Sequence, residues 1–264
     1  MLLDNTSDVM LVSMFDLLGR HALVTGGAGA LGAAACRKLV DGGATVVVAD
    51  LDSRDSRHLV AELGADRAMP VAMDVTDESS VAAAIDEGVA ALGPIDITIT
   101  AAGYGEVVSV ADMRPDQWRR MIDVHLYGTF LAIHHTLSGM IERNWGRVIA
   151  FSSIASTQGV ARQSHYSAAK SGIDGLVRSL AREVAPRGVT VNAIAPGYFE
   201  SPLNDGAGPE RLATLRDSVP VGRFGDPDEI GSLARFLSSD DAGYITGQVI
   251  SPNGAFTFCS HTGD

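Results

Sequence analysis

Short apolar, β-branched runs alternate with longer helical stretches along the chain from His21 onward. The short runs predict strands at 22–25, 45–50, 68–74, 95–100, 147–152, 189–194 and 248–251. The stretches between them predict helices at 31–41, 56–63, 78–92, 115–142, 165–185 and 227–238. This alternation is typical of a parallel sheet whose strands are joined by helices.

The strands are nearly continuous apolar runs, which indicates that both faces of the sheet are buried. No internal repeat or linker divides the pattern. We therefore expect one α/β domain over residues 14–264, a Rossmann-like, doubly wound, seven-stranded parallel sheet with helices on both faces.

Two stretches fall outside the periodic pattern. Residues 1–13 lack a basic segment and are interrupted by Asp4 and Asp8, so they predict a disordered lead-in and not a secretory signal. Residues 198–223 are rich in Gly, Pro and Asp and predict either a lid or binding loop or a simple surface connection.

The net charge of −12 over 264 residues argues against binding to nucleic acid or to an anionic membrane, and no apolar run reaches membrane-spanning length. Cys36 and Cys259 are far apart, which argues against a disulfide scaffold or a zinc site and makes the cytoplasm the expected location. The pair His134 and His135 lacks the spacing of metal ligands, so no metal is expected. A small-molecule substrate remains as the expected partner.

A glycine-rich segment, TGGAGALG at 25–32, lies between the first strand and the first helix. Glycines in this place let the backbone approach a pyrophosphate, and the helix N-terminus offers N–H groups and positive potential. The second strand ends at Asp50, whose carboxylate can accept hydrogen bonds from ribose hydroxyls and would repel a 2′-phosphate. This favours NAD over NADP, although Asp50 can also be read as a turn residue and Arg54 is close enough to reach a phosphate.

The segment YSAAK at 166–170 contains one of only two lysines among 20 basic residues, 18 of which are arginine. On a helix, Tyr166 and Lys170 lie four positions apart and therefore on one face. A neighbouring ammonium stabilises a phenolate, so it is expected to lower the pKa of Tyr166 toward neutrality and make it an acid/base. The alternative is an incidental pair of neighbours on a helix.

With these motifs, the chain resembles the short-chain dehydrogenase/reductase family, in the single-domain branch that includes the 3-oxoacyl-carrier-protein reductases. The features that carry the resemblance are TGGAGALG at 25–32, Asp74 with Val75, AAG at 101–103, Ser153, Tyr166 with Lys170, APG at 195–197 and ITGQ at 245–248. The resemblance implies that Ser153, Tyr166 and Lys170 are catalytic. It implies cofactor contacts at Thr25, Gly26, Gly29, Leu31, Gly32, Asp50, Leu51, Asp74, Val75, Ala102, Gly103, Tyr166, Lys170, Pro196, Gly197, Phe199 and Ser201.

Three positions depart from the family pattern. The middle glycine of the cofactor turn is Ala30, and Ala101 stands in place of an asparagine. His125 occupies the position of the family's fourth catalytic residue, an asparagine whose main-chain carbonyl helps to hold a water. His125 is therefore either a catalytic residue or an inert packed histidine.

These observations predict an NAD(H)-dependent oxidoreductase that interconverts a secondary alcohol and a ketone, with a 3-hydroxyacyl thioester or a small or cyclic alcohol as substrate. Relatives that prefer NADPH often carry a basic residue where this chain has Gly29. The alternative is a non-catalytic nucleotide-sensing or scaffold protein on the same fold. The resemblance also implies a homotetramer, and the helices at 115–142 and 165–185 carry small and apolar residues on more than one face, such as Ala132, Met140 and Gly175. The apolar tail at 256–259 is expected to dock on a neighbouring subunit.

Overall fold

A computed structural model describes residues 15–200 and 208–256, in which seven strands form one parallel sheet in the order β3-β2-β1-β4-β5-β6-β7. The strands are β1 His21–Thr25, β2 Thr45–Asp50, β3 Ala68–Ala72, β4 Ile97–Thr100, β5 Gly146–Phe151, β6 Val189–Ile194 and β7 Val249–Ile250. The predicted fold class, a Rossmann-like doubly wound sheet, is confirmed. The proposed lead-in, residues 1–13, lies outside the described residues.

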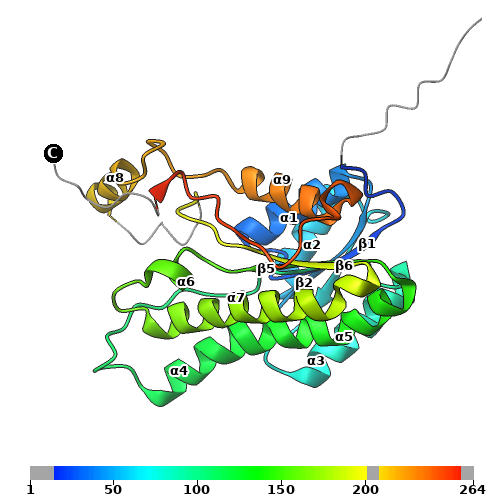
Figure 1. Cartoon of the computed structure of the whole chain (residues 1–264), viewed down its shortest axis with the longest axis horizontal. Helices are drawn as coiled ribbons and strands as arrows, with labels where there is room; N and C mark the ends of the chain where they lie inside the picture. The colour runs from blue at the N-terminus through cyan, green and yellow to red at the C-terminus, as the bar shows by residue number, and fades with distance from the viewer. Residues whose placement is uncertain (1–14, 201–207, 257–264) are drawn as a thin grey trace, which may run out of the picture.

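Helices cover both faces of the sheet (Figure 1). One face is covered by α1 (Ala30–Asp41), α2 (Ser53–Leu63) and α9 (Pro227–Ser238). The other is covered by α3 (Glu78–Leu92), α5 (Gly128–Arg143) and α7 (Ser164–Val184). The shorter helices are α4 (Pro115–Ile122), α6 (Ala155–Gln158) and α8 (Pro209–Asp217).

The strand sequences explain this three-layer arrangement. In β2, Val46 and Val48 point into the core below α1, α2 and α9, whereas Val47 and Ala49 point into the opposite core. All four side chains are fully buried. Successive residues of a strand point to opposite faces, so an uninterrupted apolar run supplies two cores at once.

The predicted helix at 115–142 is interrupted in the structure. A π-helical turn, η1 (Asp123–Tyr127), separates α4 from α5, and the Gly128 N–H donates to the carbonyl of Asp123, five residues back. The segment predicted to be irregular, 198–223, contains α8. Figure 1 places α8 and α6 toward the same end of the molecule.

All strands run in one direction, so their carboxyl ends open at one edge of the sheet. The strand order reverses between β1 and β4. Strands β2 and β3 follow on the β1 side, and β5, β6 and β7 follow on the β4 side. In open α/β sheets, ligands bind outside the carboxyl ends of the strands at such a switch point. The site is therefore expected where Thr25, Asp50, Thr100, Phe151 and Ile194 end their strands.

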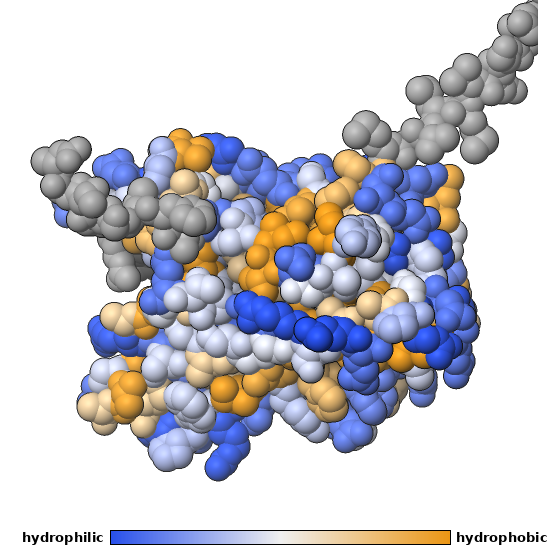
Figure 2. Space-filling view, viewed as in Figure 1, coloured by the Kyte–Doolittle hydropathy of each residue, from blue (hydrophilic) through white to orange (hydrophobic). Residues whose placement is uncertain are grey.

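Hydrophilic residues cover much of the face seen in Figure 2, with smaller hydrophobic areas between them. Within residues 15–200 and 208–256, no helix has both the length and the apolar character needed to span a bilayer.

Candidate active site

The glycine-rich turn connects β1 to α1 and is shaped by close backbone contacts. Gly26 has a φ of +64°, and a Cβ on it would lie 2.6 Å from the Cα of Ala102. A Cβ on Gly32 would overlap the carbonyl oxygen of Gly26. Glycine is therefore required at both positions, because a left-handed φ and a close backbone approach both exclude a side chain.

Asp50 fastens this turn to the end of β2. Its Oδ2 accepts a hydrogen bond from the Ala28 N–H at 3.0 Å, and its Oδ1 accepts one from the Leu51 N–H at 2.8 Å. Asp50 can therefore stabilise the turn and also accept hydrogen bonds from ribose hydroxyls, because each carboxylate oxygen retains a lone pair.

Arg54 is paired with a neighbouring carboxylate in this structure. Its guanidinium bonds to the Asp52 carboxylate at 2.7 and 3.0 Å, and this hydrogen bonding lowers the pKa of Asp52 to about 2. Asp52 also caps α2 by accepting from the Arg54 N–H. The only basic side chain that the sequence offered as a partner for a 2′-phosphate is therefore already paired.

The remaining cofactor candidates line the same edge of the sheet. The Asp74 carboxylate bonds to the N–H and hydroxyl of Thr76, and buried Val75 packs against Gly128. On the far side of the switch point, a Cβ on Gly197 would lie 2.8 Å from the Cα of Asn253. The other candidates on this edge are Thr25, Gly29, Leu31, Ala102, Gly103, Pro196 and Phe199. Ser201 lies outside the described residues.

Ser153, Tyr166 and Lys170 come together at the carboxyl end of β5. Ser153 follows that strand, and its Oγ accepts from the Ala155 N–H at 3.1 Å. Tyr166 and Lys170 lie one turn apart on α7, with Nζ of Lys170 at 5.6 Å from the centre of the tyrosine ring. Nζ also donates to the carbonyl oxygen of Phe151, the last residue of β5, at 2.6 Å.

Burial dominates the electrostatics of this cluster. It lowers the pKa of Lys170 to about 7, although the carboxylate of Asp174 opposes the shift. Burial also raises the pKa of Tyr166, and a hydrogen bond with Ser153 offsets only part of that increase. The predicted lowering of the tyrosine pKa is therefore not found, because desolvation by burial is the largest effect on the phenol.

His125 lies in η1 and its side chain is 2% exposed. Its ring stands perpendicular to that of Tyr166 at 5.2 Å, and its carbonyl oxygen accepts from the Thr129 hydroxyl at 2.7 Å. Burial, with a smaller effect from the charge of Lys170, lowers the pKa of His125 to about 3. The ring is therefore neutral at working pH, and it cannot serve as a general acid in the pH range that is usual for histidine.

Sequence reasoning missed two residues that the structure brings to the site. The carbonyl of Phe151 holds Lys170, but a backbone acceptor carries no side-chain signal. Tyr104 contacts the ring of His125 through its backbone, and its own ring lies 5.6 Å away. Its position directly after AAG was the signal that could have identified it.

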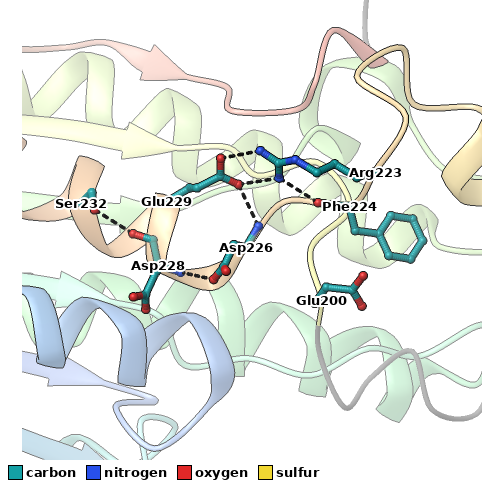
Figure 3. A pocket seen from close by; sticks show the side chains of 7 residues that line it. All are labelled: Glu200, Arg223, Phe224, Asp226, Asp228, Glu229 and Ser232. Atoms are coloured by element: carbon teal, nitrogen blue, oxygen red, sulfur yellow. Dashed lines mark hydrogen bonds and ion pairs between the residues drawn. The ribbon is translucent and has the colours of Figure 1, made fainter.

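A separate groove of about 550 Å³ lies at the start of α9 and contains none of these residues (Figure 3). It is lined by Glu200, Arg223, Phe224, Asp226, Asp228, Glu229 and Ser232. Arg223 forms a two-pronged ion pair with Glu229, and Asp226 forms a capping box with that glutamate. The polar groups of this groove thus stabilise the helix start.

The site residues fit a nicotinamide dinucleotide. The two glycines whose side chains would block the turn leave room for a pyrophosphate, and the first turn of α1 contains no acidic residue. The N–H groups at that end of the helix would therefore suit a bound anion. Within the described parts of the chain, no group of three or more His, Cys, Asp or Glu side chains is arranged to hold a metal ion.

Comparison with known proteins agrees with this geometry. A family model described as enoyl-(acyl carrier protein) reductase matches residues 26–257. The 3-oxoacyl-(acyl-carrier-protein) reductase of Vibrio harveyi is 37% identical over 239 residues, which cover 90% of this chain and 98% of that protein. The cis-4-hydroxycyclohexanecarboxylate dehydrogenase of Sinomonas cyclohexanicum is 38% identical over 241 residues, 90% of this chain and 96% of that protein.

The crystal structure of gox2181 superimposes with a TM-score of 0.89 at 34% identity, and covers 93% of this chain and 98% of that one. The chain belongs to the short-chain dehydrogenase/reductase family. It is an oxidoreductase that acts on CH–OH groups and binds a nicotinamide nucleotide.

Proposed function

We propose that the protein interconverts a secondary alcohol and a ketone with NAD(H), and that Tyr166 is the acid/base. The observation that carries this proposal is the meeting of Ser153, Tyr166 and Lys170 at the carboxyl end of β5, on the same edge of the sheet as the glycine-rich turn that follows β1. A nicotinamide cofactor supplies the hydride acceptor, or in the reverse direction the hydride donor.

Each side chain has a separate part in proton transfer. Ser153 donates a hydrogen bond to the substrate oxygen and holds it near Tyr166. In ketone reduction, Tyr166 donates its phenolic proton to that oxygen, a role that suits a phenol whose pKa is raised. In alcohol oxidation, the charge of Lys170 stabilises the phenolate that accepts the proton, so Lys170 must be protonated for this direction.

NAD is the proposed cofactor because of Asp50 and Arg54. A 2′-phosphate would meet the Asp50 carboxylate, and Arg54, the first basic residue after Asp50 in the sequence, is paired with Asp52. Gly29 likewise offers no basic side chain at the turn.

The proposed substrates are a 3-hydroxyacyl or 3-oxoacyl thioester and a small or cyclic secondary alcohol. Both kinds occur in the names of relatives that are about equally similar to the chain. The competing proposal is a non-catalytic nucleotide sensor or scaffold, favoured only by the departures at Ala30, Ala101 and His125.

Turnover separates the two proposals. Purified protein is incubated with NAD and a panel of secondary alcohols and 3-hydroxyacyl thioesters, and NADH absorbance is followed. Oxidation of one member, absent in Tyr166→Phe, supports the enzyme. Tight NADH binding without turnover of any member, in either direction, favours the sensor.

We further propose a single domain over residues 14–264 in a cytoplasmic homotetramer. Trp118, Tyr127 and Phe130 are 39–43% exposed along α4, η1 and α5, and the Tyr127 and Phe130 rings stack at 6.1 Å. Exposed aromatic clusters of this kind favour subunit contacts. Ala132 and Met140, which the sequence offered for this contact, are instead buried inside the chain.

Part of the apolar tail at 256–259 packs against its own chain. Phe256 contacts the ring of Tyr198 at 5.1 Å, and residues 257–259 lie outside the described residues.

A further inference from the structure

Asp174 is a buried carboxylate that the proposed proton transfer does not use. It is 3% exposed, and among the described residues its Oδ1 has no hydrogen-bond partner and its carboxylate forms no ion pair. The buried charges of Asp96 and Arg147 are instead paired, each at 3.1 Å, with Arg143 and Asp240. A buried carboxylate without such a partner is costly, so its presence needs a separate explanation.

Asp174 lies on the catalytic side of α7. Tyr166, Lys170 and Asp174 are spaced four residues apart, so they follow one another along one stripe of the helix. Side chains of a helix lean toward its N-terminus, which directs the carboxylate of Asp174 toward the turn that carries Lys170. Both residues are buried, so water screens the attraction between their charges only weakly.

Two other titratable groups face Lys170, and neither supplies a negative charge near neutral pH. Tyr166 is one, and burial raises the pKa of its phenol. The other is His125 of η1, whose pKa is lowered to about 3 by burial and, to a smaller extent, by the charge of Lys170. The neutral ring of His125 is fixed in place, since a Cβ on Gly103 would overlap its Cε1.

The remaining groups around the ammonium are a strand and a carboxylate. Strand β5 contributes the carbonyl oxygen of Phe151, a neutral acceptor. Burial lowers the pKa of Lys170 to about 7, and Asp174 opposes this effect. Within the part of the chain that the structure describes, Asp174 is therefore the negative charge that acts on the lysine.

We propose that Asp174 is a positioning residue that keeps the ammonium of Lys170 charged where burial alone would neutralise it. It acts through the lysine and not on the substrate. The inference rests on the proposed function, in which the charge of Lys170 stabilises the phenolate of Tyr166 during alcohol oxidation.

The composition of the chain allows a direct measurement, because Lys38 and Lys170 are its only lysines. In protein grown with isotope-labelled lysine, NMR should show two lysine signals, and Lys38→Arg assigns them by removing one. Titration of the other signal then gives the pKa of Lys170 without any turnover. Asp174→Asn removes the charge at nearly constant shape, and the pKa of Lys170 should fall by about one pH unit, the size expected for a charge roughly one helical turn away.

Two further variants make the measurement specific. Glu183→Gln removes an exposed carboxylate from the last part of the same helix and should leave the pKa of Lys170 unchanged. Asp174→Ser removes the charge with a smaller side chain, so it should lower the pKa of Lys170 as Asp174→Asn does, and it replaces that variant if the amide does not fold.

The same change should appear in the pH dependence of alcohol oxidation. If the pKa of Lys170 falls from about 7 by about one unit, the protonated fraction decreases about tenfold at pH ~8 but less than about twofold at pH ~5.5. The kcat of Asp174→Asn should therefore be about tenfold below that of the parent at the higher pH and within about twofold at the lower pH. A structural role alone would lower kcat by one factor at both pH values.

The outcomes separate this inference from the proposed function. A parent that oxidises no alcohol would overturn the proposed function, and the lysine titration would still decide whether Asp174 acts on Lys170. An unchanged pKa of Lys170 in Asp174→Asn and Asp174→Ser would overturn the inference. A loss of kcat that is the same at both pH values would overturn it as well.

Discussion

Nζ of Lys170 donates to the carbonyl oxygen of Phe151 over 2.6 Å, so the last residue of β5 holds the lysine of α7. The lysine side chain is 5% exposed and passes beside the Tyr166 ring. Strand β5 and helix α7 thus define a single position, which fits the narrow ammonium group of a lysine. A guanidinium is wider and planar, and it cannot lose its charge as this ammonium does near pH 7.

Lys170→Arg should therefore lower kcat at least about 100-fold even though the formal charge is kept. The only other lysine provides the control, since Lys38 pairs with Asp228 at the surface of α1. Lys38→Arg should retain kcat and the melting temperature. Steady-state kinetics of both variants checks this, and an active Lys170→Arg would refute the geometric requirement.

Tyr166→Phe should lower kcat by about 10²–10⁴-fold, the range that general acid–base catalysis supplies. NADH affinity should stay close to that of the parent, because only the hydroxyl is removed. The control is Tyr244→Phe, which alters a fully exposed tyrosine. Retention of parental kcat in Tyr166→Phe would mean that another group moves the proton.

Titration with both reduced cofactors should show NADH binding more than about tenfold tighter than NADPH, a difference of about 1.4 kcal/mol. Asp50→Ser should narrow that ratio by removing the carboxylate. It should also lower the melting temperature, since the Ala28 and Leu51 N–H groups lose their acceptor. Asp41→Ser, at the exposed end of α1, should change neither property. Equal affinities in the parent would refute the NAD preference.

The free energy of unfolding should decrease as the pH falls, and part of this decrease should depend on His125. Its pKa is about 3 in the folded chain against 6.5 ordinarily, so between these pH values the unfolded chain binds a proton that the folded chain does not. The free energy of unfolding then decreases as pH falls from about 6.5, by about 1.4 kcal/mol per pH unit for this group.

His125→Gln removes the titrating ring, so its stability should fall less than that of the parent between pH 6.5 and 4. His58→Gln, at an exposed position in α2, is the control and should follow the parent. Urea unfolding at several pH values measures the slopes. Identical slopes for His125→Gln and the parent would contradict the lowered pKa.

Light scattering at micromolar concentration should give about four times the chain mass of 27.6 kDa. Phe130→Asp places a charge in the exposed aromatic cluster and should reduce the assembled mass. Tyr244→Asp, on an isolated and fully exposed residue, should leave it unchanged. A parent that stays monomeric would contradict the proposed tetramer.

The strands and the placing of Tyr166 with Lys170 could be predicted because both depend on local rules. A buried parallel strand is one apolar run, and two residues four apart on a helix share a face. The π turn at 123–127 could not be predicted in this way, since neither proline nor glycine lies within it and the apolar pattern continues through it. Helix α8 was missed because Gly, Pro and Asp dominate its surroundings, although Pro209 marks its first turn.

The predicted lowering of the Tyr166 pKa was wrong for a different reason. The ammonium of Lys170 is where the spacing puts it, but the magnitude of its effect depends on how deeply both groups are buried. Burial is a property of the whole fold. Nothing in the segment 166–170 reports it.

Gly103 and His125 also restrict the order in which substitutions can accumulate. A histidine can enter position 125 only in a chain that already has glycine at 103, because any larger residue there would overlap the ring. Once the histidine is present, position 103 can no longer vary until the ring has gone. The two positions, 22 residues apart in the sequence, must therefore change in a fixed succession, so a library that randomises position 103 alone should return mostly glycine.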